Sequence, residues 1–370
     1  MRHRNFFIGN ICLGAVLCAG QIASAAGVPS FQVDSSWPGQ LPNKWTLGQV
    51  SGLAITAQDH ILVIHRPGSI NADQKMAAAN PPGAECCVPA PPVIEFAPNG
   101  KVIRAWGGPG SGYDWPQTEH GIYVDGKGNV WVSGVAGKEF GRILKFTSEG
   151  KFLMQIGENL PAGQTFTNNS TTVLGRQPAD MYLDLKTNEL FVADGDGGAS
   201  RMIVFDSESG KFKRIWGAYG EKPGELPAPK HDPDGPPSKV FSSAVHCVVE
   251  AKDGSLYVCD RNGDRVQVFK KDGTFIKEKI IAPKTMGTGS AFDVEFSPDH
   301  KYLYWADGGN QKIRILQADS LEEVGSFGGV GQGAGQFRNA HSIAVDSKNN
   351  IYVSETGEGK RVQKFVSKSR

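Results

Sequence analysis

The sequence repeats a module of short paired strands six times, and this repeat constrains the fold more than any other feature. The clearest copies read HGIYVDGKGNVWVSG, HCVVEAKDGSLYVCD and HSIAVDSKNNIYVSE, and they begin at His120, His246 and His341. In each copy, alternating apolar and polar residues flank a turn of Asp, Gly or Asn, which is typical of a β-hairpin. A third strand follows in the form Arg-apolar-x-x-Phe, and a fourth often ends in an aromatic residue and glycine, as in RAWGG and RIWGA.

Three looser copies fill the remaining length, and they start at Ser51, Ala179 and Phe292. Six copies of four strands predict an all-β protein, a six-bladed β-propeller. The composition agrees, because 47 glycines and 22 prolines favour many short strands joined by turns.

The last copy predicts how the ring closes. It has three strands before the chain stops at Arg370, whereas the segment FQV at 31–33 has no partner in the first copy. Pairing that N-terminal strand with the last blade would remove an exposed sheet edge. We therefore expect residues 26–370 to form a single domain.

Residues 1–25 have the pattern of a signal peptide. Arg2 and Arg4 precede an apolar stretch, and Ala23-Ser24-Ala25 offers small residues for cleavage. The sequence therefore predicts a periplasmic or secreted protein. The 39 basic and 38 acidic residues nearly cancel, so no net charge attracts nucleic acid. We expect a monomer without a membrane span after signal removal.

Four cysteines remain after that cleavage. Cys86 and Cys87 are adjacent in a proline-rich loop, where they form either a vicinal disulfide or a reactive pair, or else loop thiols that are bridged elsewhere or free. Cys247 and Cys259 lie on successive strands. A turn at Asp253-Gly254 is expected to place them on opposite faces, so no bridge is predicted between them.

Histidine occupies the first position of the second, fourth and sixth copies. In a propeller the innermost strands line the central channel and their starts gather at one mouth, so His120, His246 and His341 should converge about 120° apart. Three neutral imidazoles with an open fourth position suit zinc or another divalent ion. Such an ion polarises a substrate oxygen or acidifies bound water. The alternative is that repeat duplication kept these histidines without a ligand role.

Two kinds of arginine are distinguished by position. The arginine that opens the third strand should pair with the acid that ends the second, as a structural contact. Arg66 and Arg261 instead directly follow a second strand, where most copies carry a small residue. A guanidinium there would bind a carboxylate or stabilise an oxyanion, and a surface ion pair is the alternative.

These segments resemble a known family. LGQVSGLAI, IHRPGS, EHGIYVDGKGNVWVSGVA, VCDRNGDRVQVF and QFRNAHSIAVD are similar to the NHL-repeat propeller of peptidyl-α-hydroxyglycine α-amidating lyase, over most of the chain that follows the signal peptide. The resemblance implies that His120, His246 and His341 bind zinc and that Arg66 and Arg261 belong to the active site.

The sequence departs from this family at three points. Where the family has a catalytic tyrosine, the segment ADGDGGASR places Asp196, with one extra residue, and a carboxylate is a much weaker base than a phenolate. Where the family has an aspartate associated with structural calcium, this chain has Ser342, which puts calcium in doubt. The family's disulfide cysteines do not match either.

Together these features predict a secreted, metal-dependent enzyme with lyase-like chemistry on a small oxygenated or peptide-like substrate. The ion would bind a hydroxyl or carbonyl oxygen, Arg66 and Arg261 would hold an anionic group, and Asp196 would transfer a proton. Two alternatives stay open: a metal-assisted hydrolase of lactonase type, and a non-catalytic propeller that binds a peptide or partner protein on its loop face.

Overall fold

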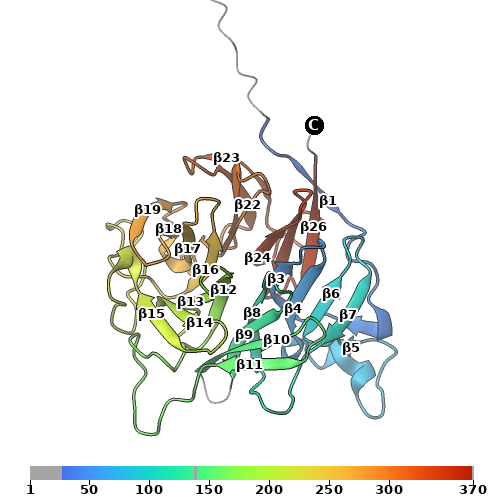
Figure 1. The fold of residues 1–370 in the computed structure, drawn as a ribbon. Helices are drawn as coiled ribbons and strands as arrows, with labels where there is room; N and C mark the ends of the chain where they lie inside the picture. The colour runs from blue at the N-terminus through green and yellow to red at the C-terminus, as the bar shows by residue number, and fades with distance from the viewer. Residues whose placement is uncertain (1–26, 137–139, 369–370) are drawn as a thin grey trace, which may run out of the picture.

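The computed structural model describes residues 27–136 and 140–368, so the predicted signal peptide lies outside the described residues. Six antiparallel sheets of four strands each follow one another in chain order (Figure 1). The predicted all-β, six-bladed propeller is therefore confirmed. Helical structure in the described residues is limited to short 3₁₀ turns.

Each blade runs from an inner strand at the centre of the ring to an outer strand at its periphery. Blade one has β3 (Gln49–Ile55), β4 (Ile61–Arg66), β6 (Val93–Phe96) and β7 (Val102–Trp106). Blade two has β8 (Thr118–Val124), β9 (Val130–Ala136), β10 (Phe140–Phe146) and β11 (Phe152–Ile156). Blade three has β12 (Pro178–Asp184), β13 (Glu189–Asp194), β14 (Arg201–Asp206) and β15 (Phe212–Trp216).

The other three blades repeat this order. Blade four has β16 (Val245–Glu250), β17 (Leu256–Asp260), β18 (Arg265–Phe269) and β19 (Phe275–Ile280). Blade five has β20 (Asp293–Phe296), β21 (Tyr302–Asp307), β22 (Lys312–Gln317) and β23 (Glu323–Gly328). Blade six has β24 (Ala340–Val345), β25 (Ile351–Glu355), β26 (Arg361–Ser367) and β1 (Phe31–Asp34).

A few short elements lie outside the blades. The two-residue strands β2 (Trp45–Thr46) and β5 (Val88–Pro89) pair in parallel. The 3₁₀ turns are η1 (Pro42–Lys44), η2 (Pro67–Ser69), η3 (Asp73–Ala78), η4 (Ala218–Gly220) and η5 (Arg261–Gly263). No helix in the described part of the chain has the length and hydropathy that a membrane span requires.

The ring closes as the sequence predicts. Strand β1 pairs antiparallel with β26, with Phe31 opposite Ser367, and the two strands lie side by side in Figure 1. The N-terminal segment thus supplies the outer strand of blade six, and the prediction of closure is confirmed.

The core lies between neighbouring blades. Ile64 of blade one packs in the same cluster as Val132 of blade two, and Val50 of blade one shares a cluster with Ala344 of blade six. Because both faces of each sheet are buried, strands such as β4 read as continuous apolar runs. This packing fixes the inner strands, and so the residues at their starts, relative to one another.

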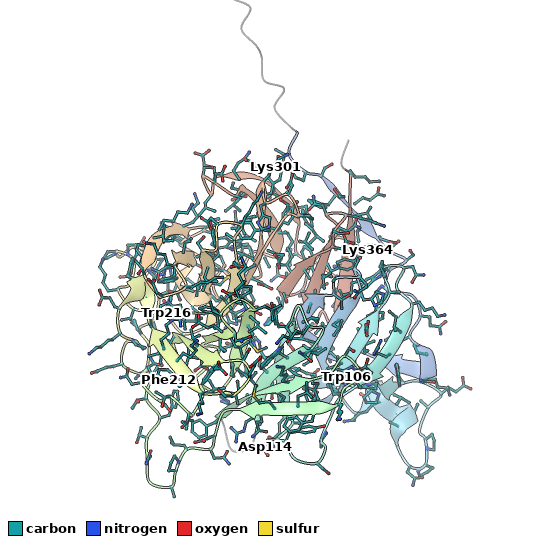
Figure 2. The ribbon with its side chains drawn as sticks, in the orientation of Figure 1. Trp106, Asp114, Phe212, Trp216, Lys301 and Lys364 are labelled. Atoms are coloured by element: carbon teal, nitrogen blue, oxygen red, sulfur yellow. A yellow bond between two sulfur atoms is a disulfide. The ribbon has the colours of Figure 1, made fainter. Side chains whose placement is uncertain are left out.

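The recurrent aromatic residues of the repeat pack across blade boundaries. Trp106 ends β7 and its ring centroid lies 5.1 Å from that of Phe146 on blade two. Trp216 ends β15 and lies 6.1 Å from Phe269 on blade four (Figure 2 labels both tryptophans). The outer strands β7 and β15 are therefore each attached to the next blade by an aromatic contact.

The predicted structural arginines form ion pairs in three blades, namely Arg201–Asp194, Arg265–Asp260 and Arg361–Glu355. Blade two differs, because Arg142 lies opposite Gly134 in the ladder and has no acid there. Its Nε instead donates to Asp114 Oδ2 at 3.2 Å. The blade-two exception follows directly from the glycine at that position.

The cysteine prediction for blade four is wrong. Cys247 and Cys259 form a disulfide with their Cα atoms 4.9 Å apart. The hairpin register places Cys247 directly opposite Cys259, and residues directly opposite each other in an antiparallel pair lie on the same face. Cys86 and Cys87 form a vicinal disulfide, which is one of the alternatives for that loop.

Candidate functional site

A β-bulge sits at the start of each histidine-bearing inner strand. The ladder of β8 with β9 shifts between Glu119 and Ile122, which leaves His120 out of register. The same shift occurs around His246 in β16 and around His341 in β24. A bulge re-aims the side chain of its extra residue, so each imidazole points toward the axis of the ring.

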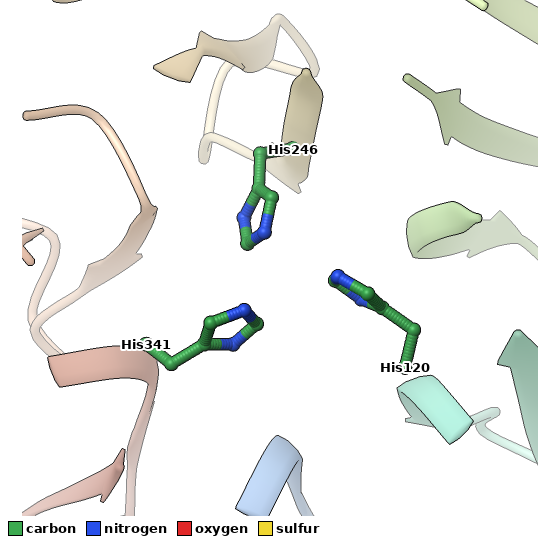
Figure 3. A group of neighbouring side chains, drawn as sticks. All are labelled: His120, His246 and His341. Carbon is green, nitrogen blue, oxygen red and sulfur yellow. The ribbon is translucent and has the colours of Figure 1, made fainter. Parts of the chain in front are cut away.

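The three imidazoles meet in a nearly equilateral triangle. Their ring centroids are 5.1 Å apart for His120 and His246, 5.1 Å for His120 and His341, and 4.8 Å for His246 and His341. One ligand atom of each residue lies within 4.8 Å of the other two. Figure 3 shows the rings pointing toward one another from three separate strands. The structure thus brings together the residues that the repeat register selects.

Backbone carbonyls of neighbouring blades orient two of the rings. Nδ1 of His120 lies 3.1 Å from the carbonyl oxygen of Ala179, and Nδ1 of His246 lies 2.6 Å from that of Phe292. A neutral imidazole that donates from Nδ1 presents a bare lone pair on Nε2. Nε2 of His246 is buried without a hydrogen-bond partner. Such an oriented, unpartnered nitrogen is what a metal ligand presents.

Burial keeps the three histidines neutral. It lowers the pKa of His120, and it lowers the pKa values of His246 and His341 well below the usual range, to which neighbouring positive groups contribute. Only neutral imidazole can ligate a metal. The chemistry of the donor set therefore fits zinc or another borderline divalent ion.

Arg66 reaches the site as the last residue of β4. Its Nε donates to the carbonyl oxygen of Glu119 at 2.7 Å, and its Nη1 donates to Gln49 Oε1 at 3.1 Å. Burial lowers the pKa of Arg66, although a guanidinium stays charged in proteins. Because Glu119 directly precedes His120, this hydrogen bond ties Arg66 to the first histidine.

Arg261 opens η5, directly after β17. Its guanidinium lies over the ring of Phe292 at 4.9 Å, and its Nη2 donates to Asp196 Oδ1 at 3.0 Å. Its side chain is 12% exposed, so this contact belongs to the interior of the site and not to the open surface. Both arginines thus lie beside the histidines with their charge directed into one small region.

Asp196 lies between Arg261 and the histidines. Its Oδ2 is 2.9 Å from Nε2 of His120 and 3.9 Å from Nε2 of His246. Burial raises the pKa of Asp196, but Arg261 and His120 lower it more, so it falls well below the usual value. The carboxylate is charged at neutral pH and is a weak base.

Several supporting residues were missed at the sequence level. Gln49 holds Arg66, and Phe292 lies beneath Arg261. Phe292 occupies the first position of its own repeat, which is the position that the histidines occupy in theirs. The repeat register therefore already indicated that Phe292 lies near the histidines. Gln49 carries no signal in the repeat pattern.

The channel beyond the histidines also contains carboxylates that sequence reasoning missed. Its cavity, of about 360 Å³, is lined by the inner strands and includes Asp180, Asp293 and Glu295. Burial raises the pKa values of Asp180 and Glu295 to about 7 and that of Asp293 well above its usual value. Asp180 and Asp293 each directly follow the first position of a repeat. This shared position in the repeat could have predicted that both carboxylates line the channel. Ser342, which stands where the related family has an aspartate, donates to Asp293 Oδ2 at 2.9 Å.

Comparisons with known proteins agree with this architecture. The NHL repeat family matches residues 337–365. NHL repeat-containing protein 3 of Mus musculus is 29% identical over 75% of this chain and 73% of its own length. A probable peptidyl-α-hydroxyglycine α-amidating lyase of Caenorhabditis elegans is 24% identical over 88% of this chain and 85% of its own length.

A solved structure supports the fold alone. A gluconolactonase of Xanthomonas campestris superposes with a TM-score of 0.52 at 12% identity, covering 94% of this chain and 92% of that chain. The chain is therefore a six-bladed β-propeller that carries a match to the NHL repeat at residues 337–365 and is similar to NHL repeat-containing protein 3 and to peptidyl-α-hydroxyglycine α-amidating lyase.

Proposed function

We propose that this chain is an exported, metal-dependent lyase that cleaves a carbon–nitrogen bond in a small substrate bearing a hydroxyl and a carboxylate. The convergence of three buried imidazoles at one mouth of the ring carries the proposal. Two arginines beside them and the distant similarity to an amidating lyase support it.

His120, His246 and His341 would hold the ion through their imidazole nitrogens. When bound, a zinc or similar ion supplies Lewis acidity, which polarises a coordinated oxygen and eases loss of a hydroxyl proton. The bulged inner strands hold the three ligands rigidly, because each strand is packed between two blades. Rigid placement of this kind reduces the reorganisation needed in the transition state.

The arginines define the substrate class. A peptidyl-α-hydroxyglycine carries a hydroxyl and a carboxylate on one carbon that is bonded to an amide nitrogen. Arg66 and Arg261 would bind that carboxylate, since guanidinium and carboxylate pair through two parallel hydrogen bonds. The hydroxyl would then face the histidine cluster, which fixes the carbon–nitrogen bond for cleavage.

The reaction needs one proton removed and one delivered. As the hydroxyl loses its proton, its electron pair forms a carbonyl, the carbon–nitrogen bond breaks, and the nitrogen takes up a proton to leave as an amide. Asp196 is the carboxylate that faces the histidines. Its low pKa makes it a poor proton acceptor, so we expect slow turnover compared with a tyrosine-bearing lyase.

Metal analysis and a product assay test this proposal together. Protein purified without chelators or nickel resins should contain about one divalent ion per chain, and it should release glyoxylate and benzamide from N-benzoyl-α-hydroxyglycine. The variant with His120, His246 and His341 all replaced by alanine should lose both properties. Metal-dependent hydrolysis of lactones without glyoxylate release would instead support the lactonase alternative. Wild-type protein that binds no ion at micromolar supply would contradict an enzyme of this type and support a binding propeller.

A further inference from the structure

Asp196 contacts the histidine cluster directly. Nδ1 of His120 lies 3.1 Å from the carbonyl oxygen of Ala179, which leaves Nε2 for a second partner. Asp196 Oδ2 lies 2.9 Å from that Nε2 and 3.9 Å from Nε2 of His246. A carboxylate oxygen placed between two imidazole nitrogens in this way can share a metal ion with them.

The distances from Asp196 to two of the three histidines are compatible with one coordination shell. In a tetrahedral site with bonds of about 2.0–2.2 Å, neighbouring ligand atoms are about 3.3–3.5 Å apart. Oδ2 of Asp196 lies 2.9 Å from Nε2 of His120 and 3.9 Å from Nε2 of His246, which brackets that separation. The carboxylate oxygen therefore lies within reach of an ion that His120 and His246 would hold.

Charge balance favours the same arrangement. Three neutral imidazoles leave the two positive charges of a divalent ion uncompensated, and Arg66 and Arg261 add two more in a largely buried region. Unpaired charge is costly in the interior. Among the described residues, Asp196 is the carboxylate in contact with the histidine nitrogens, and it alone supplies negative charge directly at the cluster.

We propose that Asp196 is a fourth protein ligand, which completes a three-histidine, one-aspartate site for a divalent ion. This inference rests on the metal site of the proposed function and adds a residue to it. Arg261 already holds the other carboxylate oxygen at 3.0 Å. The carboxylate can therefore leave the ion and stay paired with Arg261, which opens a position for a substrate oxygen.

Metal binding of the full chain tests this assignment without any activity measurement. Stripped wild-type protein and the Asp196→Asn variant are titrated with Zn²⁺ against a chelating dye and, separately, with Co²⁺ while the visible absorption of the cobalt is recorded. We expect Asp196→Asn to bind Zn²⁺ at least ten-fold more weakly and to change the cobalt spectrum, because one anionic ligand is lost.

Glu119→Gln is the matched control. Glu119 is a buried carboxylate next to His120, but its side chain accepts from Trp115 Nε1 at 2.9 Å and not from the histidine nitrogens. This variant should keep the zinc affinity within about three-fold and the cobalt spectrum unchanged, since it removes a nearby carboxylate without removing a ligand. Equal weakening in both variants would show a general charge effect and overturn the assignment.

The possible failures are distinguishable. If Asp196→Asn binds both metals as wild type does, Asp196 is not a ligand, while the three-histidine site and the proposed function stand. If wild type binds neither metal, the proposed function fails and this assignment fails with it. Should Asp196→Asn not fold, a crystal structure of zinc-loaded wild type decides the matter, because Oδ2 must then lie about 2.0–2.2 Å from the ion.

Discussion

Arg261 is held in place by contacts on two sides. Of the two arginines, it therefore gives the clearer test of substrate binding. Its guanidinium stacks over Phe292 and pairs with Asp196. If it binds the substrate carboxylate, Arg261→Ala should lower kcat/KM on the order of a hundred-fold. Arg261→Lys should restore activity only in part, because an ammonium lacks the two-pronged geometry.

Steady-state kinetics of these variants, with thermal melting measured in parallel, check this prediction. Arg176 is an exposed arginine whose backbone nitrogen donates to the carbonyl of Gly197, beside Asp196. Arg176→Ala keeps that contact and removes a positive charge nearby, so its kcat/KM should change less than about two-fold. A comparable loss in both alanine variants would mean that the overall charge of the mouth, and not Arg261 itself, governs binding.

At the scale of the strand, the bulges depend on close approach between blades. An added Cβ at Gly121 would lie 2.4 Å from the carbonyl oxygen of Ala179, which is the oxygen that orients His120. Gly121→Ala should therefore push β8 and β12 apart, cost about 1–3 kcal/mol of unfolding free energy and weaken metal binding.

Chemical denaturation and zinc titration of Gly121→Ala measure both effects. Gly68→Ala is the control, because Gly68 lies two residues after Arg66 and an added Cβ there would meet nothing within 4 Å. That variant should match wild type in both measurements. Unchanged zinc affinity in a destabilised Gly121→Ala protein would show that the bulge supports the fold without orienting His120.

Glu295, on an inner strand, makes the free energy of unfolding depend on pH. Burial raises its pKa to about 7, whereas an unfolded glutamate titrates near 4.3. Between these values the folded state holds a proton that the unfolded state has released, so the folded state is favoured less as the pH rises. Glu295→Gln removes this penalty and should stabilise the protein at pH 8 by up to about 3 kcal/mol.

Denaturation at pH 8 and pH 4, in buffer containing a chelator, checks the sign of this effect. At pH 4 the variant and wild type should have nearly the same stability, because the carboxyl is protonated in the folded protein and largely protonated in the unfolded chain. Glu208→Gln, an exposed glutamate, should show no such pH-dependent gain. Equal stabilisation at both pH values would mean that the substitution acts through packing.

At the scale of the whole molecule, the repeat register accounts for what the sequence could predict. Three predicted features depend on equivalent positions in a periodic fold. They are the number of blades, closure of the ring by residues 31–33, and the convergence of His120, His246 and His341. The Cys247–Cys259 bridge was missed because it depends on the exact register of one hairpin. The contact of Asp196 with His120 depends on the path of an irregular loop, which no repeat specifies.

Closure by β1 is the feature on which the ring as a whole depends. Phe31 packs edge-on against Tyr304, with ring centroids 5.5 Å apart, and lies 5.2 Å from Phe327, so the first strand joins blade six to blade five. Phe31→Ala should cost about 1–3 kcal/mol of unfolding free energy, because the ring is only partly buried. Deletion of residues 27–34 should have a larger effect, since it exposes the edge of β26 to pairing with other chains.

Equilibrium denaturation and light scattering measure these two outcomes in protein that lacks residues 1–25. Gln32→Ala is the matched control, because Gln32 lies on the same strand with its side chain exposed, and it should change stability by less than about 0.5 kcal/mol. A shortened chain that stays monomeric and as stable as wild type would show that the three remaining strands of blade six close the ring unaided. We expect aggregation instead, because a three-stranded terminal blade leaves an unpaired edge that nothing else in the described structure covers.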